Sequence, residues 1–182
     1  EGARTPGALA YEAGVADAAD AEPEQPPLCG EDICCLLYTS GTTGRPKGAM
    51  LPHRQILWNC INTAISWGLR ADDVSPIMTP MFHAGGLFVF LTPLFYVGGK
   101  IVLARGFDSE RSLALIQRQR CTIVLGVPTL FQMWMNSSSF AAADFSAVRY
   151  FVSGGAPCPP SLIRAWRAAK GGVLRQGYGL TE

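Results

Sequence analysis

A loop dense in hydroxyls and glycines, at residues 38–48, has the composition of a phosphate-binding site. It reads Tyr-Thr-Ser-Gly-Thr-Thr-Gly-Arg-Pro-Lys-Gly and directly follows a short apolar run at 33–38. Glycines let backbone amides approach an anion closely, hydroxyls donate hydrogen bonds, and Lys47 supplies positive charge. A Walker A loop is excluded because Pro46 replaces the glycine before the lysine and Gly48 replaces the following Ser or Thr. The pattern predicts a cradle for a polyphosphate.

Three later loops carry the other residues that could do chemistry. His83 lies in Pro-Met-Phe-His-Ala-Gly-Gly at 80–86, where a histidine by itself is more often structural than catalytic. The segment 153–157, Ser-Gly-Gly-Ala-Pro, has small residues that leave room for a flat ligand. In Gln-Gly-Tyr-Gly-Leu-Thr-Glu at 176–182, Tyr178 offers a stacking face, Thr181 a hydroxyl, and Glu182 a carboxylate suited to Mg²⁺. Together these loops could bind a planar base, a phosphate and a metal.

Apolar runs alternate with amphipathic stretches after residue 32, and this pattern predicts the elements that position the loops. We expect strands at 33–38 (buried), 74–78, 100–104, 122–125, 149–153 and 173–175. We expect helices at 53–67, 86–97, 108–120 with Asp108 as N-cap, 128–135, and from Pro159 to Gly171. Strands that alternate with helices form parallel β-α-β units, which bind ligands beyond the carboxyl ends of the strands. The predicted fold class is therefore α/β with a mainly parallel sheet.

Charge and composition bound the possible function classes. The chain has 182 residues, 48% hydrophobic and 16% charged, with a net charge of +1. These values exclude wholesale disorder and a globally basic nucleic-acid binder. Residues 1–32 carry eight acidic residues and one basic residue, so we interpret them as an acidic Ala/Pro-rich arm or linker. The basic remainder, 33–182, suits an anionic ligand, although a solvated surface explains its charge equally well.

Neither the cysteines nor the longest apolar stretch predicts a metal site or a membrane span. The six cysteines form no C-x-x-C pair, and we interpret them as buried free thiols of a reducing compartment. No signal peptide is visible, so a cytoplasmic location is predicted. The uncharged stretch 74–99 is broken by prolines and glycine pairs, and its clean apolar part is too short for a transmembrane segment.

Segments 38–48, 80–86, 126–129 (Gly-Val-Pro-Thr), 153–157 and 176–182 together closely resemble the motifs of the adenylate-forming enzymes. This superfamily comprises acyl-CoA synthetases, luciferases and peptide-synthetase adenylation domains, and the resemblance covers about residues 33–182. Within it, the segments look most like bacterial fatty-acyl-CoA ligases. The resemblance implies part of the family's large domain and a reaction in two steps. A carboxylate, here a fatty acid, attacks the α-phosphate of ATP to give acyl-AMP and pyrophosphate, and the thiol of CoA then displaces AMP.

The resemblance also assigns roles to residues of this sequence. The β- and γ-phosphates of ATP would be held by Thr39, Ser40, Gly41, Thr42, Thr43, Gly44 and Lys47. The adenine and acyl pockets would be lined by Gly154, Gly155, Ala156, Pro157, Gly177, Tyr178 and Gly179, with Tyr178 stacked on adenine. Thr181 would contact the α-phosphate, Glu182 would bind Mg²⁺, and His83 would lie beside the acyl carboxylate. Lys47, His83, Thr181 and Glu182 are thus the candidate catalytic residues, and none acts as a general base, since a carboxylate is already ionised at neutral pH.

Other readings of the same residues stay open. Family members are much longer, and the sequence lacks their ribose-binding Asp, hinge and small C-terminal domain with its catalytic Lys, so the isolated chain is expected to be catalytically incomplete. The alternatives are an acyl-AMP ligase that feeds a carrier protein, an aryl-CoA ligase, or a non-catalytic nucleotide-binding module. Exposed sheet edges would favour an oligomer. An apolar set could either line a fatty-acyl pocket or pack in the core: Phe82, Leu87, Phe88, Phe131, Trp134 and Met135.

Overall fold

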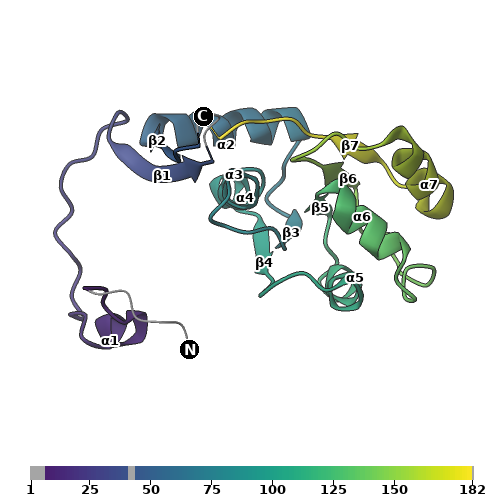
Figure 1. Ribbon diagram of the computed structural model, residues 1–182, viewed down its shortest axis with the longest axis horizontal. Coiled ribbons are helices and arrows are strands. Elements are labelled where there is room, and N and C mark those ends of the chain that lie inside the picture. Colours follow the sequence, from purple (N-terminus) through teal and green to yellow (C-terminus); the bar gives the residue numbers. More distant parts are fainter. Residues whose placement is uncertain (1–6, 41–43, 182) are drawn as a thin grey trace.

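Strands of the computed structural model, which describes residues 7–40 and 44–181, form two parallel sheets and one antiparallel hairpin (Figure 1). The first parallel sheet pairs β3 (Val74–Ile77) with β4 (Lys100–Leu103). The second has the order β5 (Ile123–Gly126), β6 (Tyr150–Ser153), β7 (Leu174–Gln176). The Thr122 N–H donates to the Val74 carbonyl at 2.8 Å, which joins the two parallel sheets where β3 and β5 begin. The predicted α/β class with parallel strands is confirmed.

The hairpin corrects the prediction for the first apolar run. β1 (Ile33–Thr39) pairs with β2 (Lys47–Pro52), and Thr39 stands opposite Lys47 in the register. The sequence predicted a loop as far as Gly48, so β2 was missed. The prediction that β1 is buried is also wrong, because only Leu37 is buried while Leu36 and Tyr38 are more than half exposed. Side chains alternate along a strand, and this two-stranded hairpin buries one face at most.

Most helices begin and end where local signals predict. They are α2 (His53–Trp67), α5 (Ser109–Arg118), α6 (Pro128–Met135) and α7 (Pro160–Lys170). Asp108 caps α5 as expected, since its Oδ1 accepts from the Arg111 N–H at 2.8 Å. The single helix predicted at 86–97 is wrong, because the chain forms α3 (Ala84–Leu87) and α4 (Leu91–Val97) with a turn between them.

Two groups of apolar side chains cover the two faces of the parallel strands. One face packs against α5, α6 and α7 through an aromatic cluster, in which the Phe131 ring lies 5.2 Å from Trp134 and 4.9 Å from Trp166, measured between centroids. The other face packs against α4 through Phe90 and Leu94. Phe131 and Trp134 are fully buried in this core, so the alternative that they line an acyl pocket is wrong for both.

Residues 7–34 are exposed throughout, and they contain the short helix α1 (Tyr11–Ala16). Cys29 and Cys34 lie in this stretch with exposed thiols, so the prediction of buried cysteines is wrong for these two. Cys60 and Cys121 are buried, and burial raises the pKa of the Cys121 thiol to about 11. In the part of the chain that the structure describes, none of the helices has both the length and the apolar character to cross a membrane.

Candidate functional site

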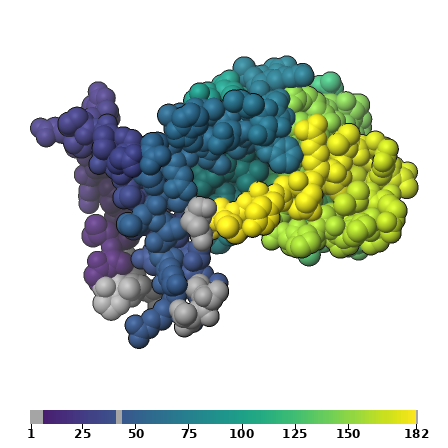
Figure 2. All heavy atoms as spheres, turned by 90° about the horizontal axis from the view of Figure 1, so that it is seen from above, coloured from purple at the N-terminus to yellow at the C-terminus, as the bar shows by residue number. Residues whose placement is uncertain are grey.

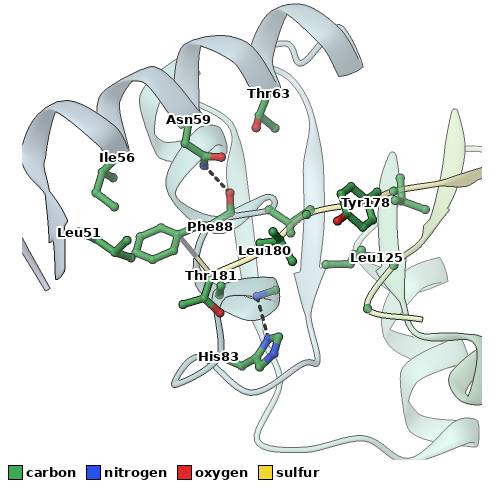
Figure 3. A pocket seen from close by; sticks show the side chains of 18 of the residues that line it. Leu51, Ile56, Asn59, Thr63, His83, Phe88, Leu125, Tyr178, Leu180 and Thr181 are labelled. Atoms are coloured by element: carbon green, nitrogen blue, oxygen red, sulfur yellow. Dashed lines mark hydrogen bonds between the residues drawn. The ribbon is translucent and has the colours of Figure 1, made fainter. Parts of the chain in front are cut away.

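A pocket of about 500 Å³ lies between α2, the segment that begins α3, and the carboxyl ends of β5, β6 and β7 (Figure 3). Figure 2 shows the C-terminal segment, in yellow, running beside α2, in blue, on one face of the molecule. The loops that follow parallel strands meet at this edge of the sheet, as the sequence predicts. The pocket is lined by Thr39, Leu51, Gln55, Ile56, Asn59, Thr63, Trp67, His83, Ala84, Gly85, Phe88, Val89, Leu125, Val152, Gly154, Gly155, Gly177, Tyr178, Gly179, Leu180 and Thr181.

Eight of the candidate site residues meet in this pocket, although they come from four separate segments. They are Thr39, His83, Gly154, Gly155, Gly177, Tyr178, Gly179 and Thr181. Five others are described but do not line it, namely Ser40, Gly44, Lys47, Ala156 and Pro157. Gly41, Thr42, Thr43 and Glu182 lie outside the described residues.

Gln176 organises the loop after β6, and the sequence reasoning gave it no role. Its Nε2 donates to the carbonyls of Gly177 at 2.9 Å, Ser153 at 3.1 Å and Ala156 at 3.3 Å. Its Oε1 accepts from the Cys158 N–H at 2.9 Å. The amide therefore holds both ends of the Ser-Gly-Gly-Ala-Pro loop against the start of the C-terminal segment. Gln176 opens the motif at 176–182, and a side-chain amide directly after the predicted strand at 173–175 was the available signal.

His83 is held by a contact that determines which of its nitrogens can act on a ligand. Nδ1 accepts from the Gly85 N–H at 3.0 Å, so His83 caps α3. An accepting Nδ1 carries no proton, so the neutral ring carries its proton on Nε2. The His83 side chain is exposed at the pocket, and Nε2 is therefore its free donor. A β-carbon on Gly86 would overlap the Pro80 carbonyl oxygen, so the tight path of this loop requires glycine there.

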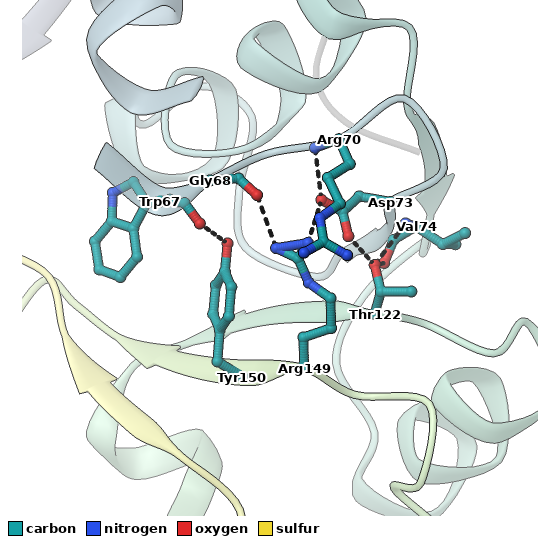
Figure 4. A network of polar contacts seen from close by, with 8 residues as sticks. All are labelled: Trp67, Gly68, Arg70, Asp73, Val74, Thr122, Arg149 and Tyr150. Atoms are coloured by element: carbon teal, nitrogen blue, oxygen red, sulfur yellow. Dashed lines mark hydrogen bonds and ion pairs between the residues drawn. The ribbon is translucent and has the colours of Figure 1, made fainter. Parts of the chain in front are cut away.

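A partly buried polar network around Asp73 anchors the end of α2 to the parallel strands (Figure 4). Asp73 is 1% exposed, and its carboxylate accepts from the Arg70 N–H at 2.8 Å and from the Thr122 hydroxyl at 2.6 Å. Arg149 places Nη1 3.5 Å from the Asp73 carboxylate, and its Nη2 donates to the Gly68 carbonyl at 2.8 Å. The network thereby positions the loop that follows α2 against the first residues of β3, β5 and β6.

Tyr150 adds a second anchor to the same helix. Its hydroxyl donates to the Trp67 carbonyl at 2.8 Å, and burial raises the pKa of this hydroxyl. The Arg175 guanidinium lies 4.1 Å from the centroid of the Tyr150 ring, within the range of a cation–π contact. Because Trp67 lines the pocket, these contacts support the wall that α2 contributes.

The described lining of the pocket lacks the positively charged side chains that the loop at 38–48 carries. Among its described lining residues there is no Asp, Glu, Lys or Arg, and His83 is the one titratable imidazole. Within the described ranges no group of three or more His, Cys, Asp or Glu could hold a metal ion. The described lining thus carries no carboxylate, ammonium or guanidinium group, and it includes the hydroxyls of Thr39, which donates to the Lys47 carbonyl at 3.5 Å, and Thr181.

The comparisons with known proteins place the chain in a family. The sequence profile of the family described as "AMP-binding enzyme" matches residues 3–182, and the chain belongs to that family. Feruloyl-CoA synthase from Amycolatopsis sp is 40% identical over 174 residues, covering 96% of this chain and 35% of that protein. Indoleacetate–CoA ligase from Aromatoleum aromaticum is 35% identical over 176 residues, covering 97% of this chain and 34% of that protein.

A solved structure agrees with the sequence relatives. The crystal structure of ATP-bound MatB from Rhodopseudomonas palustris matches with a TM-score of 0.83 and 33% identity, covering 94% of this chain and 33% of that chain. The recognition of an adenylate-forming domain from its motifs is confirmed. The chain spans about a third of the length of the curated relatives it matches.

Proposed function

We propose that the protein carrying this sequence is an ATP-dependent acid–CoA ligase that forms an acyl-adenylate. The observation that supports this most directly is the meeting of His83, Gly155, Tyr178 and Thr181 in one pocket at the strand ends. Residues 84–154 of the chain lie between His83 and Gly155, so local sequence alone would not bring them together. The family supports the reaction class, and the pocket offers a place for the two substrates of the first step, ATP and the acid.

The proposed roles follow from chemistry and position. Tyr178 is 91% exposed, so its ring face is free to stack on adenine. The His83 Nε2–H donates to the acid's carboxylate, and the Thr181 hydroxyl donates to the α-phosphate. Lys47 and the loop around it offset the negative charge that develops on the leaving pyrophosphate. The carboxylate is the nucleophile, so precise positioning supplies much of the rate enhancement.

Mg²⁺ is proposed to accompany ATP. Its predicted ligand, Glu182, lies outside them, and the described pocket lining offers hydroxyls but no carboxylate. When bound, the ion would neutralise phosphate charge during displacement. CoA is proposed as the acyl acceptor, and a carrier protein is the alternative acceptor.

The acid itself has two candidate classes. The motifs resemble fatty-acyl-CoA ligases, so a fatty acid is the first candidate. An aromatic acid is the second, and the names of the feruloyl-CoA and indoleacetate relatives favour it. Of the six apolar residues considered for an acyl pocket, Phe88 alone is among the described lining residues, so a long apolar tunnel has little support from this set.

Carboxylate-dependent ATP–pyrophosphate exchange tests the proposal. The assay uses the full-length product of the reading frame that encodes this sequence, with aliphatic acids of graded length and benzoate, and the 182-residue chain alone for comparison. Exchange with any of these acids supports the ligase. Thr181→Val should reduce exchange at least tenfold, whereas Ser161→Ala, at an exposed position of α7 outside the pocket lining, should not change it. Tight nucleotide binding without exchange for any carboxylate would instead favour a non-catalytic module.

A further inference from the structure

The wall that α2 contributes to the pocket carries polar side chains that the proposed reaction does not use. Gln55, Asn59 and Thr63 all line the pocket, and their spacing of four residues places them on one face of the helix. The side chains next to them in the lining, Ile56 and Phe88 among them, are apolar. Asn59 and Thr63 are half-buried, so a ligand that fills the pocket displaces water from them and must offer them a hydrogen-bond partner, because a desolvated donor or acceptor without one is costly.

Asn59 is held in place by one half of its amide. Its Nδ2 donates to the Phe88 carbonyl at 2.7 Å, which fixes the orientation of the side chain. Among the hydrogen bonds between described residues, this is its one side-chain bond, so the Oδ1 is left to accept from a ligand. Thr63 also lines the pocket, and its side chain projects from α2 on the same side as that of Asn59 (Figure 3). An acceptor and a hydroxyl, one helical turn apart, thus face the same cavity.

These two groups lie across the pocket from the residues proposed to hold the reacting end of the acid. Figure 3 shows Asn59 and Thr63 projecting from α2 on one side, with His83 on the opposite side and the apolar side chains of Phe88 and Leu180 between them. An acid with its carboxylate at His83 therefore directs its other end toward α2.

We propose that Asn59 and Thr63 are specificity-determining residues that recognise a hydroxyl group on the end of the acid remote from its carboxylate. This inference rests on the proposed function, because it takes His83 and Thr181 as the carboxylate end. The substrate hydroxyl donates to Asn59 Oδ1 and accepts from the Thr63 hydroxyl. A substrate that ends in hydrogen or methyl leaves both groups desolvated and unpaired, so the pocket discriminates against it.

The recognised hydroxyl group could belong to a phenol or to a hydroxylated alkyl chain. Pairs of substrates with and without the hydroxyl distinguish these two possibilities. The rate of ATP–pyrophosphate exchange is measured with the full-length protein on 4-hydroxycinnamate against cinnamate, and on 10-hydroxydecanoate against decanoate. The quantity compared is the ratio of kcat/KM within each pair. Because both members of a pair are measured on one enzyme variant, a general loss of folding or turnover cancels from the ratio.

The wild type should prefer the hydroxylated member of one pair by about tenfold or more, the discrimination expected from an unpaired polar group. Asn59→Leu should lower that preference about tenfold, and Thr63→Val should lower it several-fold. Asn62→Leu is the matched control, because Asn62 lies exposed on the same helix and does not line the pocket, and its ratio should equal that of the wild type.

The outcomes separate the inference from the proposed function. Exchange that shows no preference within either pair, or a preference that Asn59→Leu and Thr63→Val leave unchanged, overturns the role of these residues and leaves the ligase intact. Failure of every acid to support exchange overturns the ligase itself, and the inference with it.

Discussion

The Thr122 hydroxyl makes two short hydrogen bonds where the parallel sheets join, and removing this hydroxyl should destabilise the fold by about 2–3 kcal/mol. Its Oγ1 donates to Asp73 Oδ1 at 2.6 Å and accepts from the Val74 N–H at 2.9 Å. Valine has nearly the shape of threonine, so Thr122→Val opens no cavity. The measured loss would therefore report the polar contacts alone.

The magnitude follows from the character of the two partners. A hydrogen bond to a charged group contributes about 1.5–3 kcal/mol and one between neutral groups about 0.5–1.5 kcal/mol. Asp73 is 1% exposed and cannot turn toward water to replace the lost donor. Thr122 itself is half-buried, so water can replace part of the lost hydrogen bonding. The expected destabilisation therefore lies in the lower part of the sum of the two ranges, which is about 2–4.5 kcal/mol. For a chain of this size the midpoint of thermal unfolding should fall by roughly 4–12 °C.

Urea unfolding of the wild type, Thr122→Val and Thr122→Ser tests this reasoning. Serine keeps the hydroxyl, so Thr122→Ser should stay within about 1 kcal/mol of the wild type. Combining Thr122→Val with Asp73→Asn completes a double-mutant cycle, in which direct contact predicts a coupling of at least about 0.5 kcal/mol. A Thr122→Val protein as stable as the wild type, or serine and valine variants that lose equal stability, would refute the argument.

Three further predictions concern packing, acid stability and thiol reactivity. Gly86→Ala should destabilise by about 1–3 kcal/mol, because its β-carbon would overlap a backbone carbonyl, whereas Gly154→Ala, with 3.8 Å of clearance, should unfold at wild-type urea concentrations. Serine hydroxyls lower the pKa of Glu110 from 4.5 to about 2, so its stabilising effect is complete above pH 4.5 and is lost as pH falls toward 2. Glu110→Gln should therefore flatten the pH dependence of the urea midpoint in that window, and an unchanged slope would contradict this. Iodoacetamide at pH 8 should label exposed Cys29 in the folded protein but label Cys121 only after unfolding, as mass spectrometry of peptides would detect.

Elements whose signals are local could be predicted from the sequence almost to the residue. Asp108 begins α5 because its side chain satisfies a backbone N–H three residues on, and Pro128 begins α6 because the first helical residue needs no N–H donor. The strand-end position of the glycine loops also followed from the alternation of strands and helices. The helix starts depend on interactions between residues close in sequence, and the position of the glycine loops follows from the general rule that ligand-binding loops lie at the carboxyl ends of parallel strands.

The predictions that failed depended on contacts between distant segments. The helix expected at 86–97 is interrupted where the Phe88 carbonyl accepts from Asn59, 29 residues earlier in the chain. Apolar residues continue through this turn in the sequence, so their periodicity does not indicate that the helix is interrupted there. Gln176 was overlooked for a related reason, since its partners in the loop after β6 lie about 20 residues away. Periodicity indicates which face of a helix or strand is apolar, but it does not indicate which polar side chain forms a hydrogen bond to another helix or strand.

The glycines of the pocket motifs are required for different physical reasons. Gly86 is required because the backbone passes too close to the Pro80 carbonyl for any β-carbon. Gly155 has a φ of 75°, a conformation that strains other residues. Neither reason applies to Gly154, since the nearest atoms to its added β-carbon lie 3.8 Å away, yet it lines the pocket. An alanine at 154 is therefore expected to leave the fold intact and to take space from the pocket, so we expect Gly154 to matter for what the pocket binds, whereas Gly86 and Gly155 are needed for the path of the backbone.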